Sequence, residues 1–202
     1  MTFFIAGIDT DSGKTLVSAI VCEALKADYW KPIQAGYPRD SETIKDLVTS
    51  EINIHPEGYL LKTPASPHAA AKLDGVHIAV KNLILPVFKN HLVIEGAGGC
   101  LVPLNDEEFV VDLIRHFGAQ AILVADLYLG SINHTLLTLE ALHRRSIPVM
   151  GIIFNGDPNP ESERIILHHA KLPCLLRIKK EPFINKEIIR TYATELNKNW
   201  HG

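Results

Sequence analysis

The chain has 202 residues, of which 47% are hydrophobic and 21% charged, a composition typical of a soluble globular protein with one sizeable core. Its net charge of −3, with no basic stripe, argues against a general nucleic-acid-binding protein. No apolar run reaches the ~20 residues that span a bilayer, and no basic leader precedes the first apolar segment, so we expect a cytoplasmic protein without a membrane partner.

The first predicted elements are a short apolar strand, Phe3–Ile8, and a helix over Lys14–Lys26. The glycine-bearing turn between them has the sequence of a phosphate cradle, in which backbone N–H groups converge on phosphate oxygens. Lys14 supplies a charge for the β- and γ-phosphates, and Thr15 supplies a hydroxyl for Mg²⁺. A helix that starts at Gly13 aims its positive end at the same anion. These residues together predict a P-loop.

The glycine spacing of this P-loop is unusual. The standard pattern has a glycine at position 8, where this chain has Ile8, and the glycine comes one residue earlier, at Gly7. The early glycine indicates a particular branch of P-loop proteins. An ordinary strand, turn and helix with a surface lysine is the alternative interpretation.

Along the rest of the chain, apolar strand-like runs alternate with longer amphipathic segments. Strands are predicted over Tyr29–Pro32, His91–Ala97, Ala121–Asp126, Val149–Asn155 and Leu175–Ile178. Helices are predicted over Ser41–Thr49, Glu108–Phe117, Ile132–Arg145 and Ile184–Leu196. Asp40, before the first of these helices, is a candidate N-cap or functional carboxylate. Buried strands separated by helices predict an α/β fold, a single P-loop NTPase-type domain over residues 1–202 with a mostly parallel sheet and helices on both faces.

Several polar residues stand at the predicted carboxyl ends of strands, where ligands bind in such sheets. Lys31 follows the second strand, Glu95 lies in the HLVIEGAGG strand, and Asn155 ends the VMGIIFN strand. Each of them alone could be a solvated or capping group. Together with the P-loop they provide a second cation, a carboxylate for Mg²⁺ and an amide for a base, which predicts a nucleotide site.

Five segments occur in an order and spacing that resemble the dethiobiotin synthetase family. They are GIDTDSGKT, KPIQAG, SPHAAA, VIEGAGGCLVPL and LGSINHTLLT, and the resemblance extends from Gly7 to about Asn155. It implies an enzyme, a cyclo-ligase of biotin biosynthesis that uses ATP and Mg²⁺. Its other substrates would be 7,8-diaminononanoate and CO₂, which would form dethiobiotin through a carbamate and a carbamic–phosphoric anhydride.

The resemblance also implies roles for individual residues. Lys14 and Lys31 would be catalytic, because phosphoryl transfer depends on positioning and on neutralising charge. Mg²⁺ would be held by Thr15, Asp40 and Glu95. ATP would be bound by Asp11, Ser12, Gly13, Lys14, Thr15, Leu16, Asp40, Glu95, Gly96, Ala97, Gly98, Asn155 and Gly156, with Asn155 on the adenine edge. The substrate would be bound by Thr10, Lys31, Ala35, Gly130, Ser131 and Asn133.

One of these roles has a competing candidate residue, and one position departs from the pattern of the resembled family. Glu42 is a competing candidate for the metal-binding role of Asp40. At Ala35 the resembled family usually has serine or threonine, so one hydrogen bond near the substrate is absent here. Its loss costs about 1 kcal/mol and leaves the chemistry in place.

The segment Gly130–Asn133 is predicted to turn from a strand into a helix, whose free N–H groups and dipole suit a carboxylate. The resemblance implies that this helix start serves the site of a neighbouring subunit. We therefore expect a homodimer with its sites at the interface. The alternative interpretation is that Asn133 only caps its helix.

Two other classes of P-loop protein fit parts of the pattern. A regulatory or partitioning ATPase would couple its nucleotide state to partner binding, but such proteins often have a second lysine in the loop, and Ile8–Ser12 contains none. An amidotransferase-type synthetase would continue into a glutaminase domain, for which 202 residues leave no room. The scattered histidines show no transition-metal spacing, and we expect reduced thiols at Cys22, Cys100 and Cys174.

Overall fold

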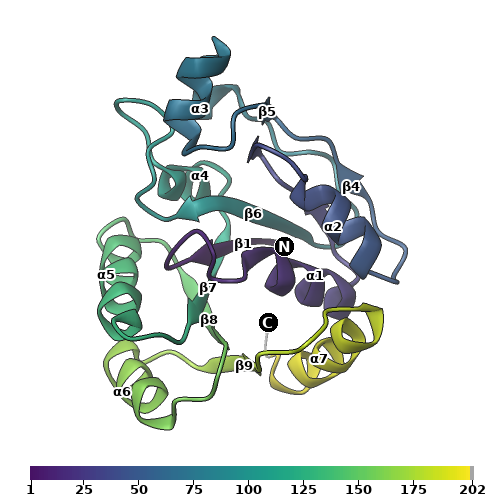
Figure 1. Cartoon of the computed structure of the whole chain (residues 1–202), viewed down its shortest axis with the longest axis vertical. Coiled ribbons are helices and arrows are strands. Elements are labelled where there is room, and N and C mark those ends of the chain that lie inside the picture. Colours follow the sequence, from purple (N-terminus) through teal and green to yellow (C-terminus); the bar gives the residue numbers. More distant parts are fainter. Residues whose placement is uncertain (201–202) are drawn as a thin grey trace.

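The apolar run near the start of the chain forms β1, Thr2–Gly7, the middle strand of a seven-stranded sheet (Figure 1). The computed structural model describes residues 1–200, and all strand pairings of this sheet within them are parallel. The strand order is β4-β2-β6-β1-β7-β8-β9. The other six strands are β2 (Asp28–Trp30), β4 (Ile54–His55), β6 (Leu92–Gly99), β7 (Gln120–Asp126), β8 (Val149–Asn155) and β9 (Cys174–Ile178).

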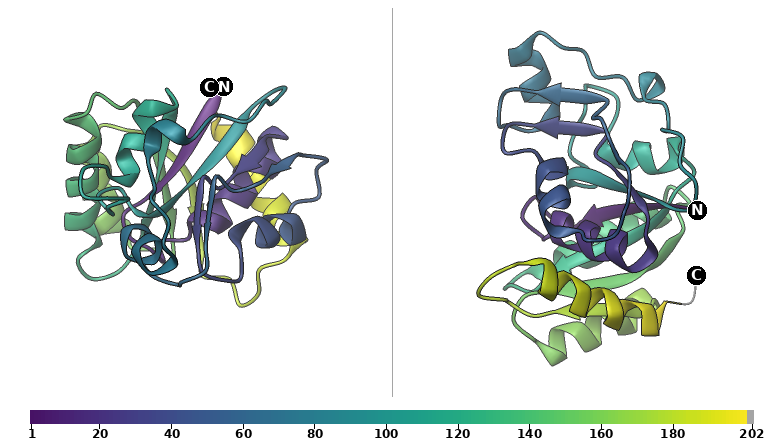
Figure 2. Two further views of the ribbon diagram at one scale, coloured as in Figure 1. Left: turned by 90° about the horizontal axis from the view of Figure 1, so that it is seen from above. Right: turned by 90° about the vertical axis from the view of Figure 1, so that its right-hand side faces the viewer.

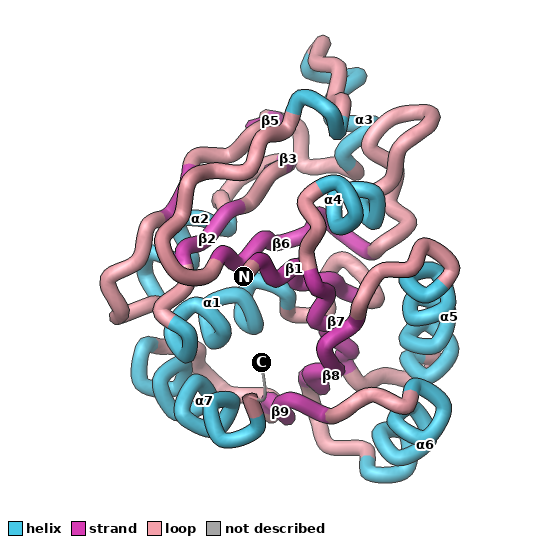
Figure 3. The backbone as a smooth tube through the Cα atoms, turned by 180° about the vertical axis from the view of Figure 1, so that it is seen from behind, coloured by secondary structure: helices cyan, strands magenta, loops and turns pink. Residues whose placement is uncertain are grey.

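Helices cover both faces of the sheet, which explains why its central strands read as continuous apolar runs (Figures 1 and 3). The helices are α1 (Lys14–Leu25), α2 (Asp40–Leu47), α3 (Pro67–Asp74), the short 3-10 helix η1 (Val80–Asn82), α4 (Val110–His116), α5 (Ser131–His143), α6 (Pro160–Ala170) and α7 (Lys186–Asn199). Successive side chains of β1 point to opposite faces. Phe3 and Ile5 join an apolar cluster with α1, α2 and α7, whereas Phe4 and Ala6 join one with α4, α5 and α6.

A second, two-stranded sheet stands above the β2 and β6 side of the main sheet (Figure 1). It pairs β3 (Ile33–Ala35) with β5 (Tyr59–Leu61) in parallel. The far end of the chain returns to its beginning, because Trp200 packs edge-on against Phe3 with ring centroids 5.1 Å apart. Figure 2 shows this return, with the end of α7 on the same side as the start of β1.

The predicted α/β fold and mostly parallel sheet are confirmed, and β8 has the predicted bounds. The last helix begins at Lys186, two residues later than predicted, because the Asn185 side chain caps it by accepting hydrogen bonds from two N–H groups. Asp40 as an N-cap is wrong: α2 begins at Asp40, and Arg39 precedes it. None of the helices within residues 1–200 has the length and apolar character needed to cross a membrane.

Candidate functional site

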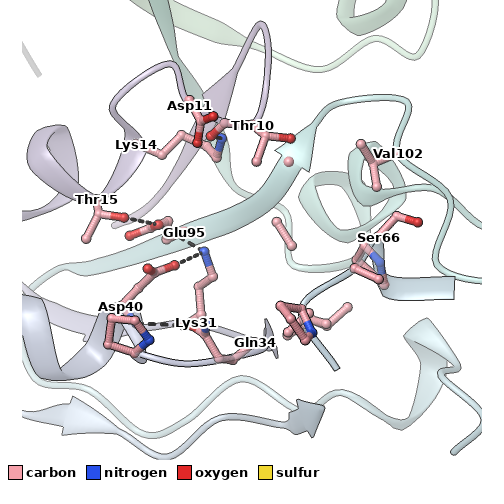
Figure 4. Close-up of a pocket in the computed structure, with 18 of the residues that line it drawn as sticks. Thr10, Asp11, Lys14, Thr15, Lys31, Gln34, Asp40, Ser66, Glu95 and Val102 are labelled. Carbon is pink, nitrogen blue, oxygen red and sulfur yellow. Dashed lines mark hydrogen bonds and ion pairs between the residues drawn. The ribbon is translucent and has the colours of Figure 1, made fainter. Parts of the chain in front are cut away.

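A cavity of about 660 Å³ opens at the carboxyl ends of β1, β2 and β6, where parallel sheets bind ligands (Figure 4). The P-loop, the β2–β3 segment, the start of α2 and the segment before α3 supply its walls. Twelve of the predicted site residues line it: Thr10, Asp11, Gly13, Lys14, Thr15, Leu16, Lys31, Ala35, Asp40, Glu95, Ala97 and Gly98.

The P-loop is arched around its own lysine. Lys14 is 4% exposed, and its Nζ donates hydrogen bonds to the backbone oxygens of Asp9, at 2.7 Å, and Thr10, at 2.8 Å. Gly13 is the N-cap of α1 and has a φ of +94°, and a Cβ there would collide with the side-chain amide of Asn155. The positive φ and the lack of space for a Cβ both explain the need for glycine at position 13.

Behind the P-loop, a buried ion cluster joins strand β2 to strand β6 (Figure 4). Lys31 Nζ lies 2.9 Å from Glu95 Oε1 and 2.5 Å from Asp40 Oδ2. Glu95 is 1% exposed and accepts two further hydrogen bonds, from Thr15 Oγ1 at 2.8 Å and from the Tyr29 hydroxyl at 2.9 Å. The predicted second cation and the predicted metal ligands therefore belong to one connected network.

The charges of this network are set by burial and by close neighbours. Burial, and then the charge of Lys31, lower the pKa of Lys14 to about 8. Burial opposes the charged form of Lys31, but Glu95 and Asp40 outweigh it and raise the pKa of that lysine. Burial likewise opposes the charged form of Glu95, but Lys31 and its other hydrogen-bond donors outweigh it and lower the pKa of that carboxyl. Lys31 and Glu95 therefore form a charged pair at neutral pH.

Comparisons with known proteins identify the family of this chain. The family model described as an AAA domain matches residues 1–187. The ATP-dependent dethiobiotin synthetase BioD of Cytophaga hutchinsonii is 56% identical over 202 residues, which cover 98% of this chain and 98% of the relative. The chain belongs to the dethiobiotin synthetase family. A second dethiobiotin synthetase, from Christiangramia forsetii, is 48% identical over 98% of this chain and 96% of its own length.

Solved structures of other proteins share the fold of this dethiobiotin synthetase family member. The cell division ATPase MinD of Pyrococcus furiosus has a TM-score of 0.59 at 14% identity and covers 98% of this chain and 99% of its own. The ParA family ATPase of Chlorobium tepidum has the same TM-score and identity, with 98% and 95% covered. At such low identity the likeness concerns the fold alone.

Some residues predicted from the dethiobiotin synthetase resemblance lie next to the cavity without lining it. Ser12 is a buried residue of the P-loop, and its carbonyl accepts a hydrogen bond from Asn155 Nδ2 at 3.0 Å. The backbone oxygen of Gly96 accepts a hydrogen bond from Lys31 Nζ at 3.1 Å. Gly156 follows β8 with a φ of +108°. The adenine-reading role of Asn155 stays a prediction.

The start of α5 contributes nothing to the wall of this cavity. Gly130 is its N-cap, Ser131 is buried, and Asn133 is exposed in its first turn. The alternative interpretation of Asn133 as a helix cap is wrong, because the cap position belongs to Gly130 and has no side-chain hydrogen bond. Likewise, Glu42 is paired with Arg39 outside the cavity, whereas Asp40 faces Lys31 inside it.

Sequence reasoning missed two residues that organise the wall and floor of this cavity. Gln34 is 5% exposed, and its side-chain oxygen accepts a hydrogen bond from the Asp40 N–H at 3.1 Å, at the start of α2. Tyr29 donates to Glu95 from beneath the cavity. For Tyr29 the sequence contained one signal. Side chains alternate between the two faces of a strand, so Tyr29 and Lys31, two residues apart, lie on the same face of β2 and its extension.

Proposed function

We propose that this cavity is the active site in which the chain makes dethiobiotin from 7,8-diaminononanoate, CO₂ and ATP. The observation that carries the proposal is that the P-loop lysine, Lys14, and the buried Lys31 face one cavity in a chain of the dethiobiotin synthetase family. Phosphoryl transfer from ATP to an acceptor depends on cations that neutralise the developing charge, and these two lysines supply them in one cavity.

The reaction consists of three bond-forming steps. One amine of the substrate attacks CO₂ and loses a proton, which gives a carbamate. A carbamate oxygen then attacks the γ-phosphorus as ADP leaves. The second amine attacks the carbonyl carbon as phosphate leaves and loses a proton, which closes the cyclic urea. Negative charge develops on the phosphoryl oxygens in the middle step, so fixed cations provide most of the catalysis.

Lys31 is suited to the carbamate and the γ-phosphate. Its ammonium group has three donors, and in this structure all three have partners in Glu95, Asp40 and the Gly96 backbone oxygen. Lys31 must therefore exchange at least one of these contacts when substrates bind. Lys14 must likewise leave the backbone oxygens of Asp9 and Thr10 to reach the β- and γ-phosphates.

We assign a Mg²⁺ site to Thr15, Asp40 and Glu95. The Thr15 hydroxyl donates to Glu95, and the Glu95 and Asp40 carboxylates both contact Lys31. An oxygen donor set with few protein ligands suits Mg²⁺, which keeps several waters and binds phosphates. Residues 1–200 contain no group of three or more His, Cys, Asp or Glu residues that could hold a metal without the nucleotide. When bound, the ion would neutralise charge on the phosphates.

We further propose a homodimer in which the start of α5 anchors the substrate carboxylate in the partner's site. The cavity walls of one chain do not include that helix start. Apolar side chains lie exposed around it, with Leu129 fully exposed and Leu137 55% exposed. Ser131 Oγ is buried and has no hydrogen-bond partner within residues 1–200. A second copy would cover the apolar groups and bring the helix dipole to a carboxylate.

We also propose a cytoplasmic location, because the reaction consumes ATP and the thiols of Cys22, Cys100 and Cys174 are free.

The proposed function is tested by measuring phosphate release from ATP. We expect release to require 7,8-diaminononanoate, bicarbonate and Mg²⁺ together. Rapid ATP hydrolysis that is unchanged by added diamine would instead indicate a switch ATPase.

A further inference from the structure

The buried Tyr29 stands beneath the cavity and makes one contact with it. Its side chain is 0% exposed in the apolar cluster between the sheet, α1 and α7. Its hydroxyl donates a 2.9 Å hydrogen bond to Glu95 Oε2. Burial and the charge of Glu95 raise the pKa of Tyr29 well above its usual range, so the hydroxyl keeps its proton.

The two oxygens of Glu95 have different neighbours. Oε1 accepts from Thr15 Oγ1 at 2.8 Å and from Lys31 Nζ at 2.9 Å, and both donors line the cavity. Among residues 1–200, the donor to Oε2 is Tyr29. Oε1 of Glu95 therefore lies on the side of the cavity, and Oε2 lies on the side of the apolar core.

If the Glu95 carboxylate rotated freely, its two oxygens would exchange places. The last torsion of a glutamate side chain is broad and roughly two-fold, so packing alone does not fix its carboxylate plane. Thr15 and Lys31 both face incoming ligands and are expected to exchange partners when nucleotide binds. Tyr29 does not line the cavity, so a ligand there cannot compete directly for its hydroxyl.

We propose that Tyr29 is a positioning residue that fixes the Glu95 carboxylate so that Oε1 faces Thr15 and the metal–nucleotide. The inference rests on the proposed metal-binding role of Glu95. Residues that orient a ligating carboxylate typically change metal affinity by about 10–100-fold when they are removed. Tyr29 therefore contributes to metal affinity without contact with metal, nucleotide or diamine.

The test is Mn²⁺ binding in the presence of a non-hydrolysable ATP analogue, measured by electron paramagnetic resonance on the full chain. Tyr29→Phe removes only the hydroxyl, and we expect the Kd for Mn²⁺ to rise about tenfold or more. Tyr192→Phe is the matched control, because Tyr192 is also buried and its hydroxyl donates to a glutamate, Glu181, away from the cavity. We expect the control to bind Mn²⁺ like the unmodified chain.

A double-mutant cycle separates this inference from the proposed function. If Tyr29 acts through Glu95, Tyr29→Phe should have no further effect in a Glu95→Gln background. Unchanged Mn²⁺ affinity in folded Tyr29→Phe would overturn the role of Tyr29. Unchanged affinity in Glu95→Gln would instead overturn the metal site itself.

The unmodified chain gives a second measurement if Tyr29→Phe does not fold. With carbon-13 at the tyrosine Cζ, the Tyr29 signal should differ from that of a free donor and stay shifted when Mg²⁺ and the ATP analogue are added, because the bond to Oε2 persists. A Tyr29 signal that moves to the position of an unbonded tyrosine on ligand binding would contradict the inference.

Discussion

Lys14 and Lys31 differ in their partners, and this difference predicts different defects. Within residues 1–200, the hydrogen-bond partners of Lys14 Nζ are two neutral backbone oxygens of the P-loop. Lys31 pairs with two carboxylates and one backbone oxygen behind the P-loop. We therefore propose that Lys14 serves ATP binding and that Lys31 serves the carbamate and the transferred phosphoryl group.

We predict that Lys14→Ala and Lys31→Ala each lower kcat by roughly 10²–10³-fold, because each removes a cation from a developing negative charge. Lys14→Ala should also raise the Kd for ATP, whereas Lys31→Ala should mainly affect kcat. Steady-state kinetics and nucleotide binding measure the two effects.

Lys45→Ala is the matched control for both variants, because Lys45 is exposed on α2 and does not line the cavity. Thermal unfolding must accompany the kinetics, since removal of Lys31 leaves Glu95 and Asp40 without their cation. Near-normal turnover by Lys31→Ala would mean that Lys31 is a structural ion-pair partner only.

At the level of elements, Gly13 is one of the glycines that the junction of β1 and α1 requires. Gly13 combines a φ of +94° with a close approach to Asn155, which in turn donates to the carbonyl of Ser12. The junction thus ties β8 to the P-loop, and its geometry leaves no room for a Cβ.

We predict that Gly13→Ala lowers the free energy of unfolding by roughly 1–2 kcal/mol or more, because it adds a steric clash to an unfavourable φ. Gly75→Ala is the control: Gly75 also has a positive φ, +69°, but a Cβ there would meet nothing within 4 Å. Chemical denaturation of both variants separates strain from clash. Equal losses would show that the contact with Asn155 is unimportant.

The elements differ in how much of them could be predicted from the sequence. Val149–Asn155 is seven residues of buried strand, and its apolar pattern predicts its bounds. Strands β3 and β5 have three residues each, too few to show a period, although β3 forms part of the cavity wall. The contact of Tyr29 with Glu95 spans 66 residues of sequence, so only the parallel pairing of β2 with β6 brings the two together.

At the scale of the whole molecule, a 22.4 kDa chain with an open cavity has little surface to enclose an aliphatic diamine. The proposed dimer supplies the missing wall through the start of α5. In a two-fold dimer each site would combine Lys31 of one subunit with Asn133 of the other.

We predict that mixed dimers recover activity from two inactive variants. Lys31→Ala removes the cation, and Asn133→Asp adds a negative charge beside the proposed carboxylate anchor. After subunit exchange, one site of each hybrid dimer is intact, so an equal mixture should regain about a quarter of the unmodified activity. Exchange without recovery would place both residues in one subunit's site.

Product labelling shows whether this chain joins CO₂, a vicinal diamine and ATP in one reaction. The purified chain is incubated with ATP, Mg²⁺, 7,8-diaminononanoate and carbon-13 bicarbonate, and the products are analysed by mass spectrometry. We predict dethiobiotin that carries the label in its urea carbon, in amounts equal to the ADP formed. ADP formation without labelled dethiobiotin would contradict the account.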